Sequence, residues 1–160
     1  GLNLISENRE LLNKLKDGKY VLTPHMKEMS RLLDVQVGEL KEKRTELLNE
    51  FVKEHRVICV LKDTRTMVFS RRCGPYVNLS GNQSMAKAGS GDVLAGIIAG
   101  FMTQGISMID AADLGVYLHG RSGDYARDDK GSYSVLARDL IHYLSYALKE
   151  QEEILRETVY

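Results

Sequence analysis

The 160-residue sequence predicts an α/β fold in which helices pack against a layered sheet. Three observations lead to this prediction. The run RVICVLKD, residues 56–63, is apolar at nearly every central position, as in a strand that helices cover on both faces. Apolar residues recur at helical spacing before and after this strand. The predicted order of strand, two helices, three strands and further helices is typical of a layered α/β domain.

Each element of the first half follows from its own pattern. Leucines and Ile5 at helical spacing predict a short amphipathic helix, which KDGK at residues 16–19 ends. The apolar and β-branched segment YVLTPH predicts a strand that breaks at Pro24. The expected elements are a helix over 4–15, a strand over 20–25, helices over 26–35 and 37–55, and strands over 56–63, 64–70 and 74–80.

The second half opens with an unusual glycine-rich stretch, MAKAGSGDVLAGIIAGF at residues 85–101. Its AGSGD part predicts a loop that leads directly into a buried helix over 92–103. Gly96 and Gly100 lie four residues apart on one face of this helix, where another element can approach closely. Two more helices are expected over 108–128 and 134–155, and the last has leucine and aromatic residues spaced as in a core or a subunit interface.

The composition favours a cytoplasmic domain that binds neither nucleic acid nor a membrane. The 22 basic residues balance 22 acidic ones, so no excess of positive charge indicates a nucleic-acid partner. No apolar run approaches the roughly 18 residues of a membrane span. Cys59 and Cys73 are too few for a disulfide scaffold, and Cys59 lies in an apolar strand, as a buried thiol in a reducing compartment. The four histidines show no metal-binding spacing, and His119 is expected to be a buried core histidine.

The AGSGD loop has the features of an anion-binding site. A buried helix start leaves N–H groups without partners, and glycines let the backbone turn close to a ligand. The helix dipole adds partial positive charge there, so a phosphate or a developing oxyanion is the expected guest. The alternative is that Asp92 only caps its helix. The spacing is neither that of a P-loop nor that of a dinucleotide fingerprint.

Three loops are expected at the carboxyl ends of the predicted strands, where ligands bind in open α/β sheets. They are TPH at 23–25, KDTRT at 62–66 and AGSGD at 88–92. Their convergence predicts a ligand site that combines a histidine, basic and hydroxyl side chains, and the glycine-rich loop.

Four motifs, in order along nearly the whole chain, resemble those of a known family: GLNLI, TPHMKEMSRLL, VLKDTRT and GNQSMAKAGSGDVLAGIIAGFMTQG. They are similar to motifs of the ADP- or ATP-dependent NAD(P)H-hydrate dehydratases, carbohydrate-kinase-like members of the ribokinase-like superfamily. The resemblance implies a ribokinase-like three-layer sandwich, of which residues 1–160 form the C-terminal portion. The first half of the fold is then expected to be absent from this chain, which by itself would be inactive.

The resemblance also assigns roles to particular residues. Asp92 would contact the substrate and act as the catalytic base, and His25 would contact the substrate. Asp63 departs from the family, which has glycine there, and Met26-Lys27 replace Pro-Gly. Met85 and Ala86 would pack beneath the glycine-rich loop. The nucleotide-binding residues would be Lys62, Asp63, Thr64, Arg65, Thr66, Gly89, Ser90 and Gly91. No residue is assigned to a metal, and Mg²⁺ would enter with ADP or ATP as co-substrate.

The implied activity is dehydration of the S epimer of NAD(P)H hydrate to NAD(P)H, a repair reaction of nicotinamide nucleotides in the cytoplasm. Hydroxide is a poor leaving group, so phosphorylation of the hydroxyl before elimination is the expected route. The family further implies a homo-oligomer, a tetramer among its members, and a fused or separate NAD(P)H-hydrate epimerase. Two alternatives stay open: a small-molecule kinase of the same superfamily, and a non-catalytic fragment that binds adenine nucleotide.

Overall fold

A four-stranded sheet and four helices form most of the first of two units into which the chain folds. The computed structural model describes residues 1–8, 10–15, 20–71 and 74–158. Residues 1–78 and 107–113 make up the first unit, and residues 79–106 and 114–160 make up the second.

The sheet is mixed and its strands follow chain order, β1-β2-β3-β4. The strands are β1 (Val21–Leu22), β2 (Ile58–Leu61), β3 (Met67–Phe69) and β4 (Tyr76–Val77). Strands β1 and β2 are parallel, with Val21 opposite Ile58. The pairs β2–β3 and β3–β4 are antiparallel, so Val68 lies opposite Val60 on one side and Tyr76 on the other. All four residues of β2 are buried, as its apolar run predicts.

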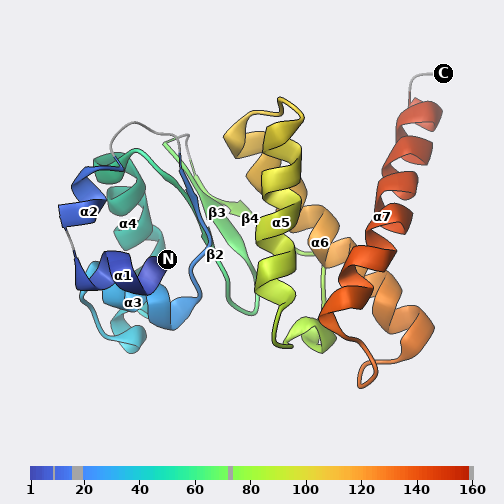
Figure 1. Ribbon diagram of the computed structural model, residues 1–160, viewed down its shortest axis with the longest axis horizontal. Helices are drawn as coiled ribbons and strands as arrows, with labels where there is room; N and C mark the ends of the chain where they lie inside the picture. The colour runs from blue at the N-terminus through green and yellow to red at the C-terminus, as the bar shows by residue number, and fades with distance from the viewer. Residues whose placement is uncertain (9, 16–19, 72–73, 159–160) are drawn as a thin grey trace. The chain divides into compact units, whose positions relative to one another are not determined.

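Four helices lie on one side of this sheet (Figure 1). They are α1 (Leu2–Glu7), α2 (Glu10–Asn13), α3 (Met26–Leu33) and α4 (Val37–His55). Their apolar faces and the sheet enclose a core that includes Met29, Leu40, Leu48, Cys59 and Phe69. Burial raises the pKa of the Cys59 thiol to about 12, so this thiol is unreactive in the folded chain. The predicted buried thiol is confirmed, whereas Cys73 lies outside the described residues.

The first predicted helix was wrong in extent, because two short helices, α1 and α2, stand where one was expected. Asn8 follows the end of α1, and both its backbone N–H and its side-chain amide donate to the Leu4 carbonyl oxygen, at 3.1 and 3.2 Å. An asparagine side chain that competes for helix carbonyl groups ends a helix more readily than it continues one. The predicted end at residues 16–19 lies outside the described residues.

All four predicted strands are shorter than expected, and β2 covers Ile58–Leu61 where a strand over 56–63 was predicted. Strand β1 stops at Leu22, ahead of Pro24, and β3 begins only at Met67 because residues 62–66 form the turn between β2 and β3. Strand β4 has two residues, after which the chain leaves the sheet. Helix α4 has the predicted bounds, with non-helical backbone angles at Lys43.

The second unit is helical. It contains the short 3₁₀ helix η1 (Gln83–Met85), α5 (Ser90–Thr103), most of α6 (Met108–Lys130) and α7 (Ala137–Thr158). The three predicted α-helices are confirmed, although α5 begins two residues earlier and α7 three residues later than expected. The prediction that α5 is a buried helix was wrong, because Ser90, Leu94 and Ile98 are its only buried residues. Helices α5 and α7 lie side by side (Figure 1), and Ala126, Val135, Leu140 and Tyr143 form a core between α6 and α7. None of the helices in the described ranges is long and apolar enough to cross a membrane.

Close packing at glycines occurs on α6 and not at the expected pair, Gly96 and Gly100 of α5. A Cβ atom at Gly96 or Gly100 would meet no described atom within 4 Å, so the predicted close packing at this pair was wrong. Helix α6 supplies the close contacts instead. A Cβ atom would lie 2.7 Å from Ile98 Cγ1 at Gly115, 2.1 Å from Ser80 Oγ at Gly120 and 2.2 Å from Met85 Sδ at Gly123.

Candidate active site

The glycine-rich loop turns sharply into helix α5. Gly89 occupies the N-cap position with a φ angle of 88°, in the left-handed region that glycine adopts without strain. A Cβ atom on Gly89 would also lie 3.2 Å from Ala137 Cβ, the first residue of α7. Asp92 is the third residue of α5 and is exposed. The interpretation of Asp92 as the helix cap was therefore wrong, because Gly89 holds that position and no side chain caps this end.

The backbone N–H groups of the loop differ in whether they donate a hydrogen bond to another backbone group. Ser90 N–H donates to the Lys87 carbonyl at 3.2 Å, and Asp92 N–H donates to the Gly89 carbonyl at 3.1 Å. Gly91 N–H donates to no backbone acceptor in the part of the chain that the structure describes. N–H groups in the first turn of a helix point out of its N-terminal end, where the helix dipole favours negative charge. The Gly91 N–H is therefore the group of this loop that is best placed to donate a hydrogen bond to an anion.

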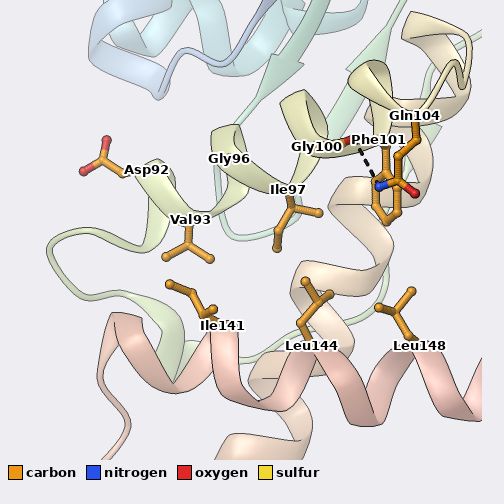
Figure 2. Close-up of a pocket in the computed structure, with 10 residues that line it drawn as sticks. All are labelled: Asp92, Val93, Gly96, Ile97, Gly100, Phe101, Gln104, Ile141, Leu144 and Leu148. Carbon is orange, nitrogen blue, oxygen red and sulfur yellow. Dashed lines mark hydrogen bonds between the residues drawn. The ribbon is translucent and has the colours of Figure 1, made fainter.

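Asp92 lies at one end of an apolar groove between α5 and α7, with a volume of about 570 Å³ (Figure 2). Figure 2 shows the Asp92 carboxylate pointing away from the apolar side chains of the groove. Its other lining residues are Val93, Gly96, Ile97, Gly100, Phe101, Gln104, Ile141, Leu144 and Leu148. Such a lining suits an apolar ligand surface rather than a phosphate. Asp92, at one end of the groove, is the one charged residue of this lining.

His25, in the first unit, forms the N-cap of α3. Its Nδ1 accepts from Glu28 N–H at 3.2 Å, and its own N–H donates to Glu28 Oε2 at 2.8 Å, which together make a capping box. Because Nδ1 accepts, the proton of the neutral ring lies on Nε2. The side chain is 51% exposed, so this capping box holds the imidazole in place while leaving its surface open to a ligand.

The TPH and KDTRT loops meet at one edge of the sheet, as predicted. His25 and Lys62 pair as an isolated parallel bridge, and Lys62 N–H donates to the Pro24 carbonyl at 2.8 Å. The two loops follow β1 and β2, whose carboxyl ends share this edge because the strands are parallel. The AGSGD loop belongs to the second unit, and its convergence with the other two loops stays a prediction.

The remaining residues of the KDTRT turn have distinct surroundings. Arg44 on α4 lies 3.5 Å from Asp63 Oδ2, which offsets the negative charge that Asp63 brings to this turn. Thr64 and Arg65 are exposed, and the Thr66 carbonyl accepts from Asn78 N–H at 2.9 Å. The turn therefore has backbone hydrogen bonds at both ends and exposed residues at its tip.

Two interactions near these loops escaped the sequence analysis. His119 was correctly predicted to be buried, but its Nε2 lies 3.0 Å from the Ser90 carbonyl oxygen, inside the glycine-rich loop. The histidine and glutamate spacing of TPHMKE, three residues apart, was the available signal for the His25 capping box. No comparable local signal links residues 29 positions apart, such as Ser90 and His119.

The mixed sheet and the glycine-rich loop that opens α5 belong to a ribokinase-like α/β fold, as a comparison with solved structures shows. A solved ribokinase-like superfamily protein from Enterococcus faecalis matches 88% of this chain and 50% of its own, with a TM-score of 0.66 and 30% identity. The family model of the NAD(P)H-hydrate dehydratases matches residues 1–145, and the chain belongs to this family.

Named relatives are similar over most of this chain. The bifunctional NAD(P)H-hydrate repair enzyme of Moorella thermoacetica is 43% identical over 85% of this chain and 26% of its own length. The ADP-dependent (S)-NAD(P)H-hydrate dehydratase of Neisseria meningitidis is 38% identical over 81% of this chain and 44% of its own. The ADP/ATP-dependent dehydratase of Bacillus subtilis, co-crystallized with ATP and Mg²⁺, matches 81% of this chain and 47% of its own, at a TM-score of 0.76 and 32% identity. The chain thus spans between about a quarter and a half of these relatives.

Proposed function

We propose that the protein containing this chain dehydrates the S epimer of NAD(P)H hydrate to NAD(P)H at the expense of ADP or ATP. Residues 1–160 are proposed to be the C-terminal portion of its ribokinase-like domain. One observation carries the proposal: the chain belongs to the dehydratase family, and its glycine-rich turn presents the Gly91 amide beside the exposed Asp92 carboxylate. An anion-binding amide and an adjacent base are the parts that phosphoryl transfer to a hydroxyl requires.

In the proposed reaction, the substrate hydroxyl attacks the terminal phosphoryl group of the nucleotide while Asp92 takes the hydroxyl proton. The bond from that phosphorus to the bridging oxygen breaks, which releases AMP from ADP, or ADP from ATP. The Gly91 amide, with Gly89 and Ser90 shaping the turn, stabilises charge on the transferred group. The phosphorylated hydroxyl then leaves as inorganic phosphate with loss of a ring proton, and the reduced nicotinamide is restored.

The nucleotide is proposed to lie along the turn from Lys62 to Thr66. Lys62 and Arg65 supply positive charge, Thr64 and Thr66 supply hydroxyl groups, and Arg44 offsets the charge of Asp63. Within the described ranges no three His, Cys, Asp or Glu side chains gather as a metal site. Mg²⁺ is proposed to enter with the nucleotide, held mainly by its phosphate oxygens, where it would neutralise their charge.

The other proposed partners follow from the same family. His25 is proposed to contact the hydrated nicotinamide, because its imidazole is exposed and fixed beside Lys62. A homo-oligomer is proposed, and an NAD(P)H-hydrate epimerase, fused or separate, is the proposed source of the S epimer. The free and buried Cys59 thiol is consistent with action in the reducing cytoplasm.

The deciding experiment supplies NADH hydrate, ADP and Mg²⁺ to the protein as encoded. Recovery of absorbance by reduced nicotinamide, together with equimolar phosphate and AMP, is the expected result. Accumulation of a phosphorylated nicotinamide product would instead indicate a kinase. Binding of ADP in a calorimeter without any turnover would indicate a non-catalytic nucleotide-binding protein.

A further inference from the structure

Hydrogen bonds hold the segment that leads into the glycine-rich loop against α6. Ser80 Oγ donates to the Tyr117 carbonyl at 2.9 Å, and Gly81 N–H donates to Asp124 Oδ2 at 3.0 Å. Asn82 Nδ2 donates to Asp124 Oδ1 at 2.8 Å and to the Gly123 carbonyl at 3.0 Å. Residues 80–82 are therefore held at several points on α6, before the chain reaches η1.

Small residues on α6 make this contact possible. Gly120 admits Ser80, and Gly123 admits the Met85 side chain, because a Cβ atom at either glycine would overlap these neighbours. In the sequence HGRSGD at 119–124, two glycines leave room for residues of the segment 80–92. Asp124 and His119 form hydrogen bonds with the same segment. Met85 packs against this face of α6, whereas Ala86, also expected to pack beneath the loop, is exposed.

His119 is the member of this face that reaches the proposed catalytic loop itself. Its ring is buried, and Nε2 lies 3.0 Å from the carbonyl oxygen and 3.4 Å from the Oγ of Ser90, which is also buried. A carbonyl oxygen only accepts, so Nε2 carries the proton and donates to Ser90. This bond fixes the residue directly before the Gly91 amide and two before Asp92.

We propose that His119 is a positioning residue, which holds the first turn of α5 so that Gly91 N–H and the Asp92 carboxylate keep the geometry needed for phosphoryl transfer. The proposal rests on the proposed function for its kinetic consequence. A displacement of about 1 Å in such a constellation can reduce the rate on the order of 10²-fold. His119 touches neither reactant in this proposal, and it acts only through Ser90.

The test compares three variants in the protein as encoded. His119→Phe keeps a ring but removes the donor, and His119→Gln keeps an N–H donor near the position of Nε2. Ser122→Ala is the matched control, because Ser122 is a fully buried polar residue of the same helix that donates to the Leu118 carbonyl within α6. The readouts are kcat, the KM values for ADP and for NADH hydrate, the thermal midpoint, and hydrogen exchange of the amides in residues 87–93.

The expected result is a fall in kcat of roughly 10- to 100-fold for His119→Phe with little change in the KM for the hydrate. His119→Gln should recover most of this loss, and Ser122→Ala should change the thermal midpoint but not kcat. Equal losses in the Phe and Gln variants, or an unchanged kcat in both, would overturn the proposal.

Hydrogen exchange separates this proposal from the proposed function. Faster exchange across residues 87–93 in His119→Phe, but not in Ser122→Ala, is expected whether or not the wild-type protein turns over NADH hydrate. If the wild-type protein is inactive and this difference is still seen, the proposed function fails while the anchoring of the loop by His119 holds. If protection of the loop is the same in all variants, the anchoring fails.

Discussion

Asp92 differs in its surroundings from Asp124 and Asp139, two other carboxylates of the second unit. Asp124 and Asp139 are engaged by backbone N–H groups and basic side chains, whereas Asp92 is exposed beside an amide with no described backbone acceptor. A carboxylate in the first turn of a helix is also stabilised by the helix dipole. Asp92 is therefore accessible to a hydroxyl group of a bound ligand.

Replacing Asp92 by Asn should lower kcat by about 10² to 10⁴, because a positioned general base contributes that much. Binding of ADP should persist, since the Gly91 amide and the Lys62–Thr66 turn are unaltered. Steady-state assays and calorimetry measure the two effects separately. Turnover equal to that of the wild-type protein would remove Asp92 from the mechanism.

Asp139 illustrates a carboxylate with a structural role at the start of α7. It is buried, and Lys130 Nζ lies 2.7 Å from Oδ1 while Leu136 N–H donates to Oδ2 at 2.8 Å. The hydrogen bond from Lys130 is the main cause that lowers the pKa of Asp139 below its ordinary value, with the Leu136 amide adding to the effect. A lowered pKa in the folded state means that the unfolded chain binds this proton first as the pH falls.

The stabilisation by Asp139 should therefore be complete above the ordinary aspartate pKa of about 3.9, and it should be lost as the pH falls through the lowered value in the folded state. Asp139→Asn should lower the thermal midpoint at pH 7, and its difference from the wild-type protein should shrink below about pH 4. Asp128→Asn, at an exposed neighbour on α6, is the control and should change little. A constant difference for Asp139→Asn from pH 7 to pH 3 would contradict this account.

At the scale of elements, α6 organises the second unit. Its glycines at 115, 120 and 123 let α5, Ser80 and Met85 approach more closely than any side chain would allow. The hydrogen bonds of Ser80, Gly81 and Asn82 to this helix hold the segment that precedes the glycine-rich loop. Helix α6 thus holds the loop and the segment before it, although the bonded residues are about 30 to 40 positions apart in the sequence.

Gly120→Ala should destabilise the protein by about 1–3 kcal/mol, the usual cost of overpacking, because the new Cβ atom would lie 2.1 Å from Ser80 Oγ and 2.8 Å from the Ser80 carbonyl carbon. Gly96→Ala is the matched control in a helix interior with open space around the new atom. It should stabilise the protein by about 0.5–1 kcal/mol, since alanine loses less backbone entropy than glycine. Urea unfolding measures both changes, and equal effects of the two substitutions would refute the close contact at Gly120.

At the scale of the whole molecule, α7 carries apolar side chains that the described structure leaves exposed. Ile141 and Leu155 are 60% and 64% exposed, and Tyr146 and Ile154 are about half exposed. Ile141 and Leu148 also line the groove beside α5 (Figure 2). Apolar surface of this kind commonly marks a protein interface, which agrees with the proposed homo-oligomer.

The protein should therefore be larger than a monomer by light scattering coupled to size exclusion. A double substitution, Ile141→Glu with Leu148→Glu, should shift the population to a smaller species, because charges at an apolar interface lose hydration. Lys149→Glu is the control on the same helix, at a side chain that is 75% exposed. A monomeric wild-type protein would refute the proposed homo-oligomer, and an oligomer that survives the double substitution would place the interface elsewhere.

The local pattern of apolar residues predicted much of the fold, because the periodicities of helices and strands depend on residues close together in the sequence. The bounds of α4 and the presence of α5, α6 and α7 follow from apolar spacing alone. The pairing of the TPH and KDTRT loops could be predicted because consecutive parallel strands end at a common edge. The break at Asn8 and the cap at His25 were missed, since both depend on single side-chain hydrogen bonds that compete with the backbone.

The sequence by itself determined the helices after the first, the buried strand, the family and the position of the glycine-rich loop with Asp92 beside it, because each is carried by residues close together in the chain. Tertiary structure alone decided which glycines are sites of close packing, and that His119 holds Ser90. These contacts join segments about 30 to 40 residues apart, and their geometry depends on how whole helices pack, which no local pattern records.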